Sequence, residues 1–187
     1  RGFDVDKAYA ACRKMQTTLP QKHSSGGFVG NENLEPYLKH GFVPYGAKSK
    51  LGHSPEKWLT SNTLEYSYDD WTVAQFAKAL GKQEDAAAFL KRAGNWRHIF
   101  DPQTGFMRPK KEDGTWLEPF DPYNTPGFTE GNAWQYTWFV PQDVPGLVAA
   151  MGRERFVSRL DEAMEKSWKT RFNATGERYE LFPVNHG

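Results

Sequence analysis

The sequence has very little cysteine, almost no net charge and no long apolar run. Cys12 is the single cysteine of the 187 residues, so no disulfide bond can form within the chain, and we predict a buried thiol on a helix face. The 24 Lys and Arg residues balance the 23 Asp and Glu residues, which leaves no electrostatic reason to expect nucleic acid or an anionic membrane as a partner. No apolar stretch is long enough to span a bilayer.

The chain also lacks an initiator methionine, because it begins at Arg1. We therefore expect a fragment of a longer protein, and a signal peptide on that protein would not be visible in this sequence. The sequence by itself assigns no cellular compartment.

Aromatic residues, in contrast, are abundant. The chain contains 7 Trp, 8 Tyr and 13 Phe residues, and 38% of all residues are hydrophobic, which is enough for a packed core. Flat aromatic faces stack on sugar rings, so this composition favours an uncharged carbohydrate ligand. A dense aromatic core is the alternative explanation.

Apolar residues recur three and four positions apart through most of the chain, which predicts an all-α fold. The helices that we expect cover residues 5–17, 32–39, 62–80, 83–100, 132–139, 144–151 and 153–172. Because Gly81 leaves only a short connection, the helices 62–80 and 83–100 should pair as an αα-hairpin. No repeat of about 20 to 50 residues is evident, which argues against a helical solenoid.

Two turn signals, Thr104-Gly105 and Asp113-Gly114, interrupt the helical pattern. They flank the segments 106–111 and 115–118, which we predict to form a small β-hairpin excursion from the helical scaffold. Arg108 in this excursion could contact a substrate hydroxyl, and a structural salt bridge is an equally good interpretation.

The stretch 127–143 sets a lone carboxylate among aromatic rings. Glu130 follows the turn Pro126-Gly127 and comes just before the helix expected from Asn132. Aromatic neighbours lower the local dielectric, which favours a carboxyl that keeps its proton near neutral pH, as a general acid must. The alternative is a carboxylate that only accepts hydrogen bonds at a helix N-terminus.

Three residues after Glu130 are candidates for substrate binding. Trp134 offers a flat ring for stacking on a sugar, and the amides of Asn132 and Gln135 could bind hydroxyl groups beside the acid.

The helix 62–80 carries an acidic stripe. Glu65 and Asp69 lie four residues apart on one face, with Asp70 beside them. Carboxylates on an aromatic-rich helix could line a sugar pocket. A solvated face, or an internal ion pair with Arg or Lys, is the alternative that the sequence leaves open.

The run TEGNAWQY at 129–136, followed by FVPQDVPGL at 139–147, resembles the signature of glycoside hydrolase family 92, the calcium-dependent exo-acting α-mannosidases. The resemblance extends to TLEYSYDDWTVAQFAKALGK at 63–82 and to FLKRAGNWRHIFDPQTGFMRPK at 89–110. It implies that Glu130 is the general acid. It also implies an (α/α)6 toroid after a β-sandwich domain, so residues 1–187 would be about half of the toroid, without the sandwich.

The same resemblance implies a reaction: removal of terminal α-linked mannose, with α-1,2 as the expected linkage, by a single displacement that inverts configuration. The base aspartates and most ligands of the catalytic Ca²⁺ would then lie beyond residue 187, and Asn185 and His186 are weak candidates for metal contacts. The expected partners are a mannose-containing glycan and the missing remainder of the catalytic domain. The expected location is extracellular or periplasmic.

Two other classes of function remain open at this stage. The chain could belong to a different (α/α)6 glycosidase. It could also be a non-catalytic carbohydrate-binding module, which would expose aromatic rings without needing an acid among them.

Overall fold

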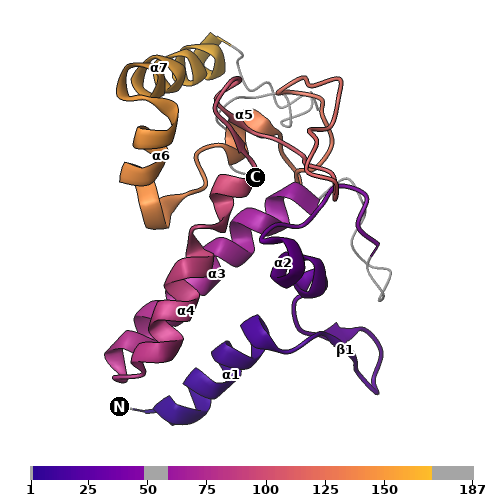
Figure 1. Cartoon of the computed structure of the whole chain (residues 1–187), viewed down its shortest axis with the longest axis vertical. Helices are drawn as coiled ribbons and strands as arrows, with labels where there is room; N and C mark the ends of the chain where they lie inside the picture. Colours follow the sequence, from indigo (N-terminus) through magenta and orange to yellow (C-terminus); the bar gives the residue numbers. More distant parts are fainter. Residues whose placement is uncertain (1, 49–58, 170–187) are drawn as a thin grey trace.

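The computed structural model of the chain describes residues 2–48 and 59–169 and is mostly helical (Figure 1). The α-helices are α1 (Val5–Thr17), α2 (Leu34–His40), α3 (Leu59–Ala79), α4 (Gln83–Ala93), α5 (Ala133–Tyr136), α6 (Val144–Met151) and α7 (Arg153–Lys169). Short 3-10 turns follow α4 at Asn95–His98 and precede α6 at Pro141–Asp143. No helix in the described residues is both long and apolar enough to cross a membrane.

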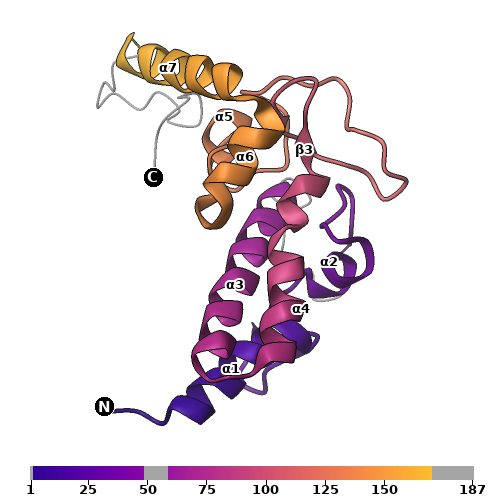
Figure 2. The ribbon, with the colours of Figure 1, turned by 60° about the vertical axis from the view of Figure 1, so that its left-hand side comes forward.

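The centre of the fold is the hairpin of α3 and α4, which pack along each other (Figure 2). Gly81 allows the tight reversal because its φ of 73° lies in the left-handed region that glycine adopts without strain. α1 lies across the closed end of this hairpin, where the ring of Tyr9 packs edge-on against Phe76 with centroids 5.4 Å apart. The αα-hairpin predicted from the sequence is therefore confirmed.

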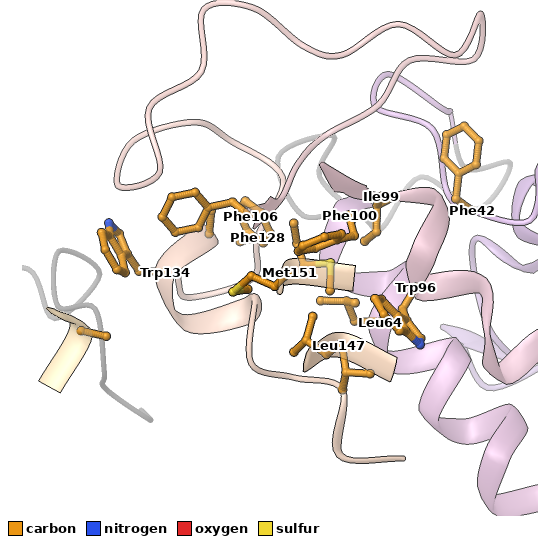
Figure 3. Packing of buried hydrophobic residues seen from close by; sticks show 14 residues of the cluster. Phe42, Leu64, Trp96, Ile99, Phe100, Phe106, Phe128, Trp134, Leu147 and Met151 are labelled. Carbon is orange, nitrogen blue, oxygen red and sulfur yellow. The ribbon is translucent and has the colours of Figure 1, made fainter. Parts of the chain in front are cut away.

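The largest hydrophobic cluster lies at the other end of the hairpin, where α5, α6 and α7 gather. Figure 3 shows it running from Phe42 and Trp96, past Leu64 and Met151, to Phe106 and Trp134. Burial of so many aromatic side chains stabilises this end of the molecule most, because each contributes a large apolar area. This cluster supports the segment that contains Glu130.

Two small antiparallel hairpins interrupt the helices. β1 (Gln21–Lys22) pairs with β2 (Phe28–Val29), and β3 (Phe100–Asp101) pairs with β4 (Phe106–Met107). The predicted turn at Thr104-Gly105 thus joins β3 to β4, whereas the segments around Asp113-Gly114 are linked by the single bridge between Lys110 and Trp116. The excursion exists, but its main ladder lies earlier in the chain than predicted, and the β1–β2 hairpin was not predicted.

Several helix boundaries differ from the prediction. α3 already includes Leu59, three residues before the predicted start of the helix at residue 62. α4 ends at Ala93, because the N–H of Gly94 turns back to the carbonyl oxygen of Lys91 at 3.3 Å. The apolar pattern continues to Phe100 because Trp96 in the following 3-10 turn, Ile99 and Phe100 of β3 are buried as well.

α5 is also shorter than predicted. It ends after Tyr136, where the hydroxyl of Thr137 donates to the carbonyl oxygen of Ala133 at 2.6 Å and accepts the N–H of Met107 at 3.0 Å. A threonine hydroxyl that bonds to the preceding turn competes with regular helix geometry. The chain beyond Thr137 is consequently free to fold its Trp138 and Phe139 side chains against the main cluster.

The prediction of a buried Cys12 thiol is wrong. Cys12 is exposed, and so is Met15 on the same predicted apolar face. The side of α1 that meets α3 and α4 carries Tyr9 and Gln16 instead, which lie two turns apart and are both buried. Gln16 fits there because its amide donates to the carboxylate of Asp69 at 3.1 Å.

Candidate active site

Glu130 lies in a turn, residues 127–132, that is held against the first part of α3. The N–H of Ser61 on α3 donates to the carbonyl oxygen of Gly127 at 3.0 Å. Gly127 has a φ of 131°, and a β-carbon at this position would lie 2.5 Å from Oγ1 of Thr60. A glycine is therefore required where the turn approaches the helix.

Glu130 itself has left-handed backbone geometry, with a φ of 49°. Among the residues that the structure describes, it alone combines a positive φ with a side chain other than hydrogen. Left-handed backbone disfavours L-residues with a β-carbon, and such strain concentrates at functional sites. The side chain of Glu130 is exposed.

The residue before Glu130 is fixed by three hydrogen bonds. The Thr129 N–H donates to the Ser61 hydroxyl at 3.2 Å, and the two hydroxyls of Thr129 and Ser61 lie 3.0 Å apart. The hydroxyl of Tyr136 donates to the Thr129 carbonyl oxygen at 2.8 Å. Thr129 is thus held by Ser61 of α3, which precedes the turn in the sequence, and by Tyr136 of α5, which follows it. Neither contact was predicted.

The residues after Glu130 form a capping box. The Asn132 side chain accepts the Gln135 N–H at 3.2 Å, and the Gln135 side chain accepts the Asn132 N–H at 3.0 Å. This reciprocal pair satisfies the first donors of α5 and fixes where the helix begins. The two predicted substrate-binding amides therefore lie directly beside Glu130, with their side-chain oxygens engaged in the cap.

Trp134 lies in the core. Its side chain is 3% exposed and packs edge-on against Phe106 with centroids 4.9 Å apart. The cationic groups of Arg159 and Lys166 lie 5.1 and 5.0 Å from its ring centre. In this structure the ring anchors α5 to α7, and these contacts occupy the surface that the sequence offered for sugar stacking.

Glu65 is exposed on α3, one turn beyond Ser61. The pKa of the Tyr136 hydroxyl is raised by burial, then by the negative charge of Glu65 and also by that of Glu130. Both carboxylates are therefore within electrostatic range of one hydroxyl group. Of the acidic stripe, Glu65 is thus the member whose charge acts on the same hydroxyl group as the charge of the predicted acid.

Asp70 lies elsewhere and is completely buried. Its carboxylate pairs with the guanidinium of Arg92, with Nε 2.9 Å from Oδ2, and accepts the Tyr37 hydroxyl at 2.8 Å. Burial raises its pKa to about 6, although Arg92 and Tyr37 both favour the charged form. This arrangement corresponds to the internal ion pair that the sequence left open as an alternative.

Asp69 faces α1, where Gln16 donates to it, and burial raises its pKa. Arg108 is likewise an internal residue, because it pairs with Asp101 at 2.9 Å and with Glu118 at 2.7 Å. For Arg108 the salt-bridge interpretation is confirmed.

A metal site is not evident in the described part of the chain. Residues 2–48 and 59–169 contain no group of three His, Cys, Asp or Glu side chains placed to hold an ion. Asn185 and His186, the weak metal candidates, lie outside the described residues.

The residues that sequence reasoning missed are Ser61 and Thr129, and the hydroxyl of Tyr136. Ser61 lies just before the helix that was predicted to begin at residue 62, and Tyr136 lies among the aromatic residues of the stretch 127–143. The contact between Ser61 and Thr129 joins residues 68 positions apart, so no local pattern predicts it. The one signal in the sequence was that these residues lie in or beside the motifs 63–82 and 129–136.

Comparison with known proteins places this geometry in a family. A model described as the glycosyl hydrolase family 92 catalytic domain matches residues 1–186. An uncharacterized secreted glycosidase from Arthroderma benhamiae is 30% identical, over 85% of this chain and 23% of the relative.

Solved structures agree with this match. A family GH92 inverting mannosidase from Bacteroides thetaiotaomicron is 38% identical, with a TM-score of 0.74 over 87% of this chain and 21% of that one. A family GH92 α-mannosidase from the same organism, also solved with mannoimidazole, is 37% identical, with a TM-score of 0.75 over 93% of this chain and 21% of that one. The predicted fold class, an all-α part of an α/α toroid with a small β-hairpin excursion, is confirmed.

The chain spans about a fifth of the length of these relatives. With a family model matching nearly its whole length, the chain belongs to glycosyl hydrolase family 92.

Proposed function

We propose that the protein to which this chain belongs is an exo-acting α-mannosidase that removes terminal α-linked mannose, with Glu130 as the general acid. The observation that carries the proposal is the left-handed backbone of Glu130, held in a turn whose flanking residues are fixed by α3 and α5. The names of the solved relatives support mannose as the sugar. The α-1,2 linkage is part of the proposal and follows from the family resemblance.

The proposed reaction is a single displacement. The Glu130 carboxyl gives its proton to the glycosidic oxygen as the bond to the anomeric carbon breaks, so the leaving sugar departs as a neutral alcohol. A water molecule attacks the opposite face of the ring and gives its proton to a second carboxylate, which inverts the configuration. An inverting site holds the two carboxyl groups roughly 6.5–9.5 Å apart to admit that water.

The base in this scheme comes from the part of the protein that follows residue 187, in accordance with the family resemblance. Within the chain, we propose that Glu65 orients a hydroxyl group of the sugar, because its exposed carboxylate acts electrostatically on the Tyr136 hydroxyl, as Glu130 does. Asp70 has a structural role in the proposal, since Arg92 and Tyr37 already occupy its carboxylate.

Calcium is also part of the proposal, with ligands outside the described residues. Ca²⁺ takes roughly six to eight oxygen ligands, and the described segments offer no cluster of three acidic or histidine side chains. The described residues do not form a calcium site by themselves, so none of the steps above depends on the ion.

The complete architecture and the location are proposals as well. We propose that a β-sandwich precedes the chain and that the second half of the toroid follows it. We propose an extracellular or periplasmic location, supported by the relative from Arthroderma benhamiae, which is named as secreted.

The test is a comparison of leaving groups in the full-length enzyme. Glu130→Gln keeps the size of the side chain but replaces the acidic carboxyl by an amide that cannot protonate the leaving group. It should therefore slow the cleavage of natural mannosides far more than that of an activated aryl mannoside. Equal losses on both substrates would exclude the general-acid role. Unchanged rates on both would favour a binding role for this part of the domain.

A further inference from the structure

Three hydroxyl groups are connected to one another around Thr129, the residue before Glu130. They belong to Ser61 on α3, Thr129 in the 127–132 turn and Tyr136 on α5. The side chains of Ser61 and Tyr136 also interact with each other. Thr129 is therefore contacted by two side chains that themselves form one unit.

The contact from Tyr136 acts on the peptide group that leads into Glu130. The Thr129 carbonyl oxygen, which accepts the Tyr136 hydroxyl at 2.8 Å, belongs to the peptide plane between Thr129 and Glu130. The orientation of that plane sets the φ angle of Glu130, which is 49°. A left-handed φ at a residue with a β-carbon is maintained only when its surroundings restrict the alternatives.

The Thr129 N–H is held by a second residue, Ser61 of α3. It donates to the Ser61 hydroxyl at 3.2 Å, and the hydroxyl of Thr129 lies 3.0 Å from the same oxygen. The peptide planes on both sides of Thr129 are thus held, one by α3 and the other by α5. A rotation of the 129–130 peptide would break the bond to Tyr136 and redirect the Glu130 side chain.

Two contacts restrict how far Tyr136 can follow such a rotation. The ring stacks on Phe128 with centroids 5.5 Å apart and planes inclined by 29°. The backbone of Gly131 also approaches the ring closely, because a β-carbon on Gly131 would lie 3.0 Å from Cε2 of Tyr136. The hydroxyl is presented to Thr129 by a side chain with little freedom of its own.

We propose that Ser61 and Tyr136 are positioning residues for catalysis, which keep the Thr129–Glu130 peptide in the orientation that directs the Glu130 carboxyl at the leaving-group oxygen. This inference rests on the proposed function of Glu130. Neither residue transfers a proton to the substrate. Their effect is on where the acid lies when the bond breaks, and a displacement of an acid by a fraction of an ångström slows proton transfer markedly.

The experiment uses the full-length enzyme and a series of aryl mannosides whose leaving groups differ in basicity. Tyr136→Phe keeps the ring and its stacking on Phe128 but removes the hydroxyl. We expect kcat to fall about tenfold for the most basic leaving group and to change little for the most activated one, with KM nearly constant. Ser61→Ala removes the contacts on the other side of Thr129 and should give the same pattern.

Tyr9→Phe is the matched control, since it makes the same chemical change at a distance. The Tyr9 ring is buried and its hydroxyl donates to Asp85 at 2.6 Å, between α1 and α4. Its removal should affect stability but leave the dependence of kcat on the leaving group unchanged.

A double variant separates positioning from a general loss of structure. If Tyr136 acts through Glu130, Tyr136→Phe should have no further effect on kcat once Glu130→Gln is present, measured on a substrate of intermediate leaving-group basicity that Tyr136→Phe alone slows and that Glu130→Gln still cleaves. If Glu130→Gln shows the leaving-group dependence and Tyr136→Phe does not, the positioning role is wrong. If Glu130→Gln itself shows none, the proposed function fails, and this inference fails with it.

Discussion

Gly127 lies against Thr60 with no space for a side chain: a β-carbon on Gly127 would lie 2.5 Å from Oγ1 of Thr60 and 2.9 Å from Cγ of Pro109. This contact sets the distance between the 127–132 turn and α3. It gives a direct test of whether the turn must stay in place for activity.

Gly127→Ala should therefore destabilise the full-length protein and lower its activity. The substitution adds a clash to an unfavourable φ of 131°, so we expect a loss of about 2–3 kcal/mol in the free energy of unfolding. Gly114→Ala is the control, because Gly114 also has a positive φ, 85°, but open space around it. Thermal unfolding should show a smaller loss for the control, about 1 kcal/mol, and unchanged kinetics.

Glu130→Gly should stabilise the protein relative to Glu130→Gln, while both variants lose activity on natural mannosides. Glycine adopts the φ of 49° without the strain that a β-carbon creates. We expect a difference of up to about 1 kcal/mol in the free energy of unfolding, because glycine also gains freedom in the unfolded chain. A Glu130→Gly variant less stable than Glu130→Gln would show that the backbone at this position is not strained.

Two acidic residues of α3 should respond in opposite ways to neutral substitution. Asp70→Asn leaves the partly buried Arg92 without its partner and should cost about 3 kcal/mol of stability, with KM and kcat little changed well below the unfolding temperature. Glu65→Gln should change stability by less than about 0.5 kcal/mol, since the residue is exposed. We expect it to raise KM or lower kcat, and normal kinetics for this variant would remove Glu65 from the proposed site.

Removal of calcium should abolish the activity of the full-length enzyme. A chelator withdraws an ion whose oxygen ligands, in our proposal, lie outside the described residues. Activity on aryl mannosides would be measured before and after chelation and again after Ca²⁺ is restored, with Mg²⁺ as the control ion. Full activity in the presence of the chelator would point to a glycosidase that does not use the metal.

Residues 1–187 expressed alone should neither cleave mannosides nor behave as a stable monomer. α7 exposes Val157 by 50% and Met164 by 53%, and apolar surface of this kind favours association when nothing covers it. Solution mass and mannosidase activity of the isolated chain are the measurements. A well-behaved, active monomer would show that the base lies within this chain.

The helices were predictable where hydrophobic spacing and glycine agree. α2 ends at Gly41 and α6 at Gly152, both with positive φ, and Asp143 caps α6 by accepting the N–H of Gly146 at 3.0 Å. These signals are local, so a single sequence contains them. α4 was predicted too long because the apolar pattern continued through Gly94 into residues that are buried in a 3-10 turn and in β3.

The 127–132 turn shows the opposite case. The motif containing Glu130 identified the candidate acid, but nothing local indicates a left-handed backbone at a glutamate, a residue type that disfavours it. The hydrogen bonds of Ser61 join residues that are 68 positions apart in the sequence, and the burial of Trp134 depends on α7. Such properties follow from tertiary packing, which local spacing does not encode.

α3 connects the two ends of the described structure as one uninterrupted helix. Thr60 and Ser61 touch the turn that carries Glu130, while Phe76, four turns further on, packs against Tyr9 of α1. At 1.5 Å per residue these contacts lie roughly 22 Å apart along the axis. Loss of a whole side chain at the far end of the helix, well away from any sugar, can therefore shift the helix axis and displace the acid, and temperature-sensitive loss of activity is the phenotype to expect. Tyr9→Phe avoids this effect because it keeps the ring that packs against Phe76.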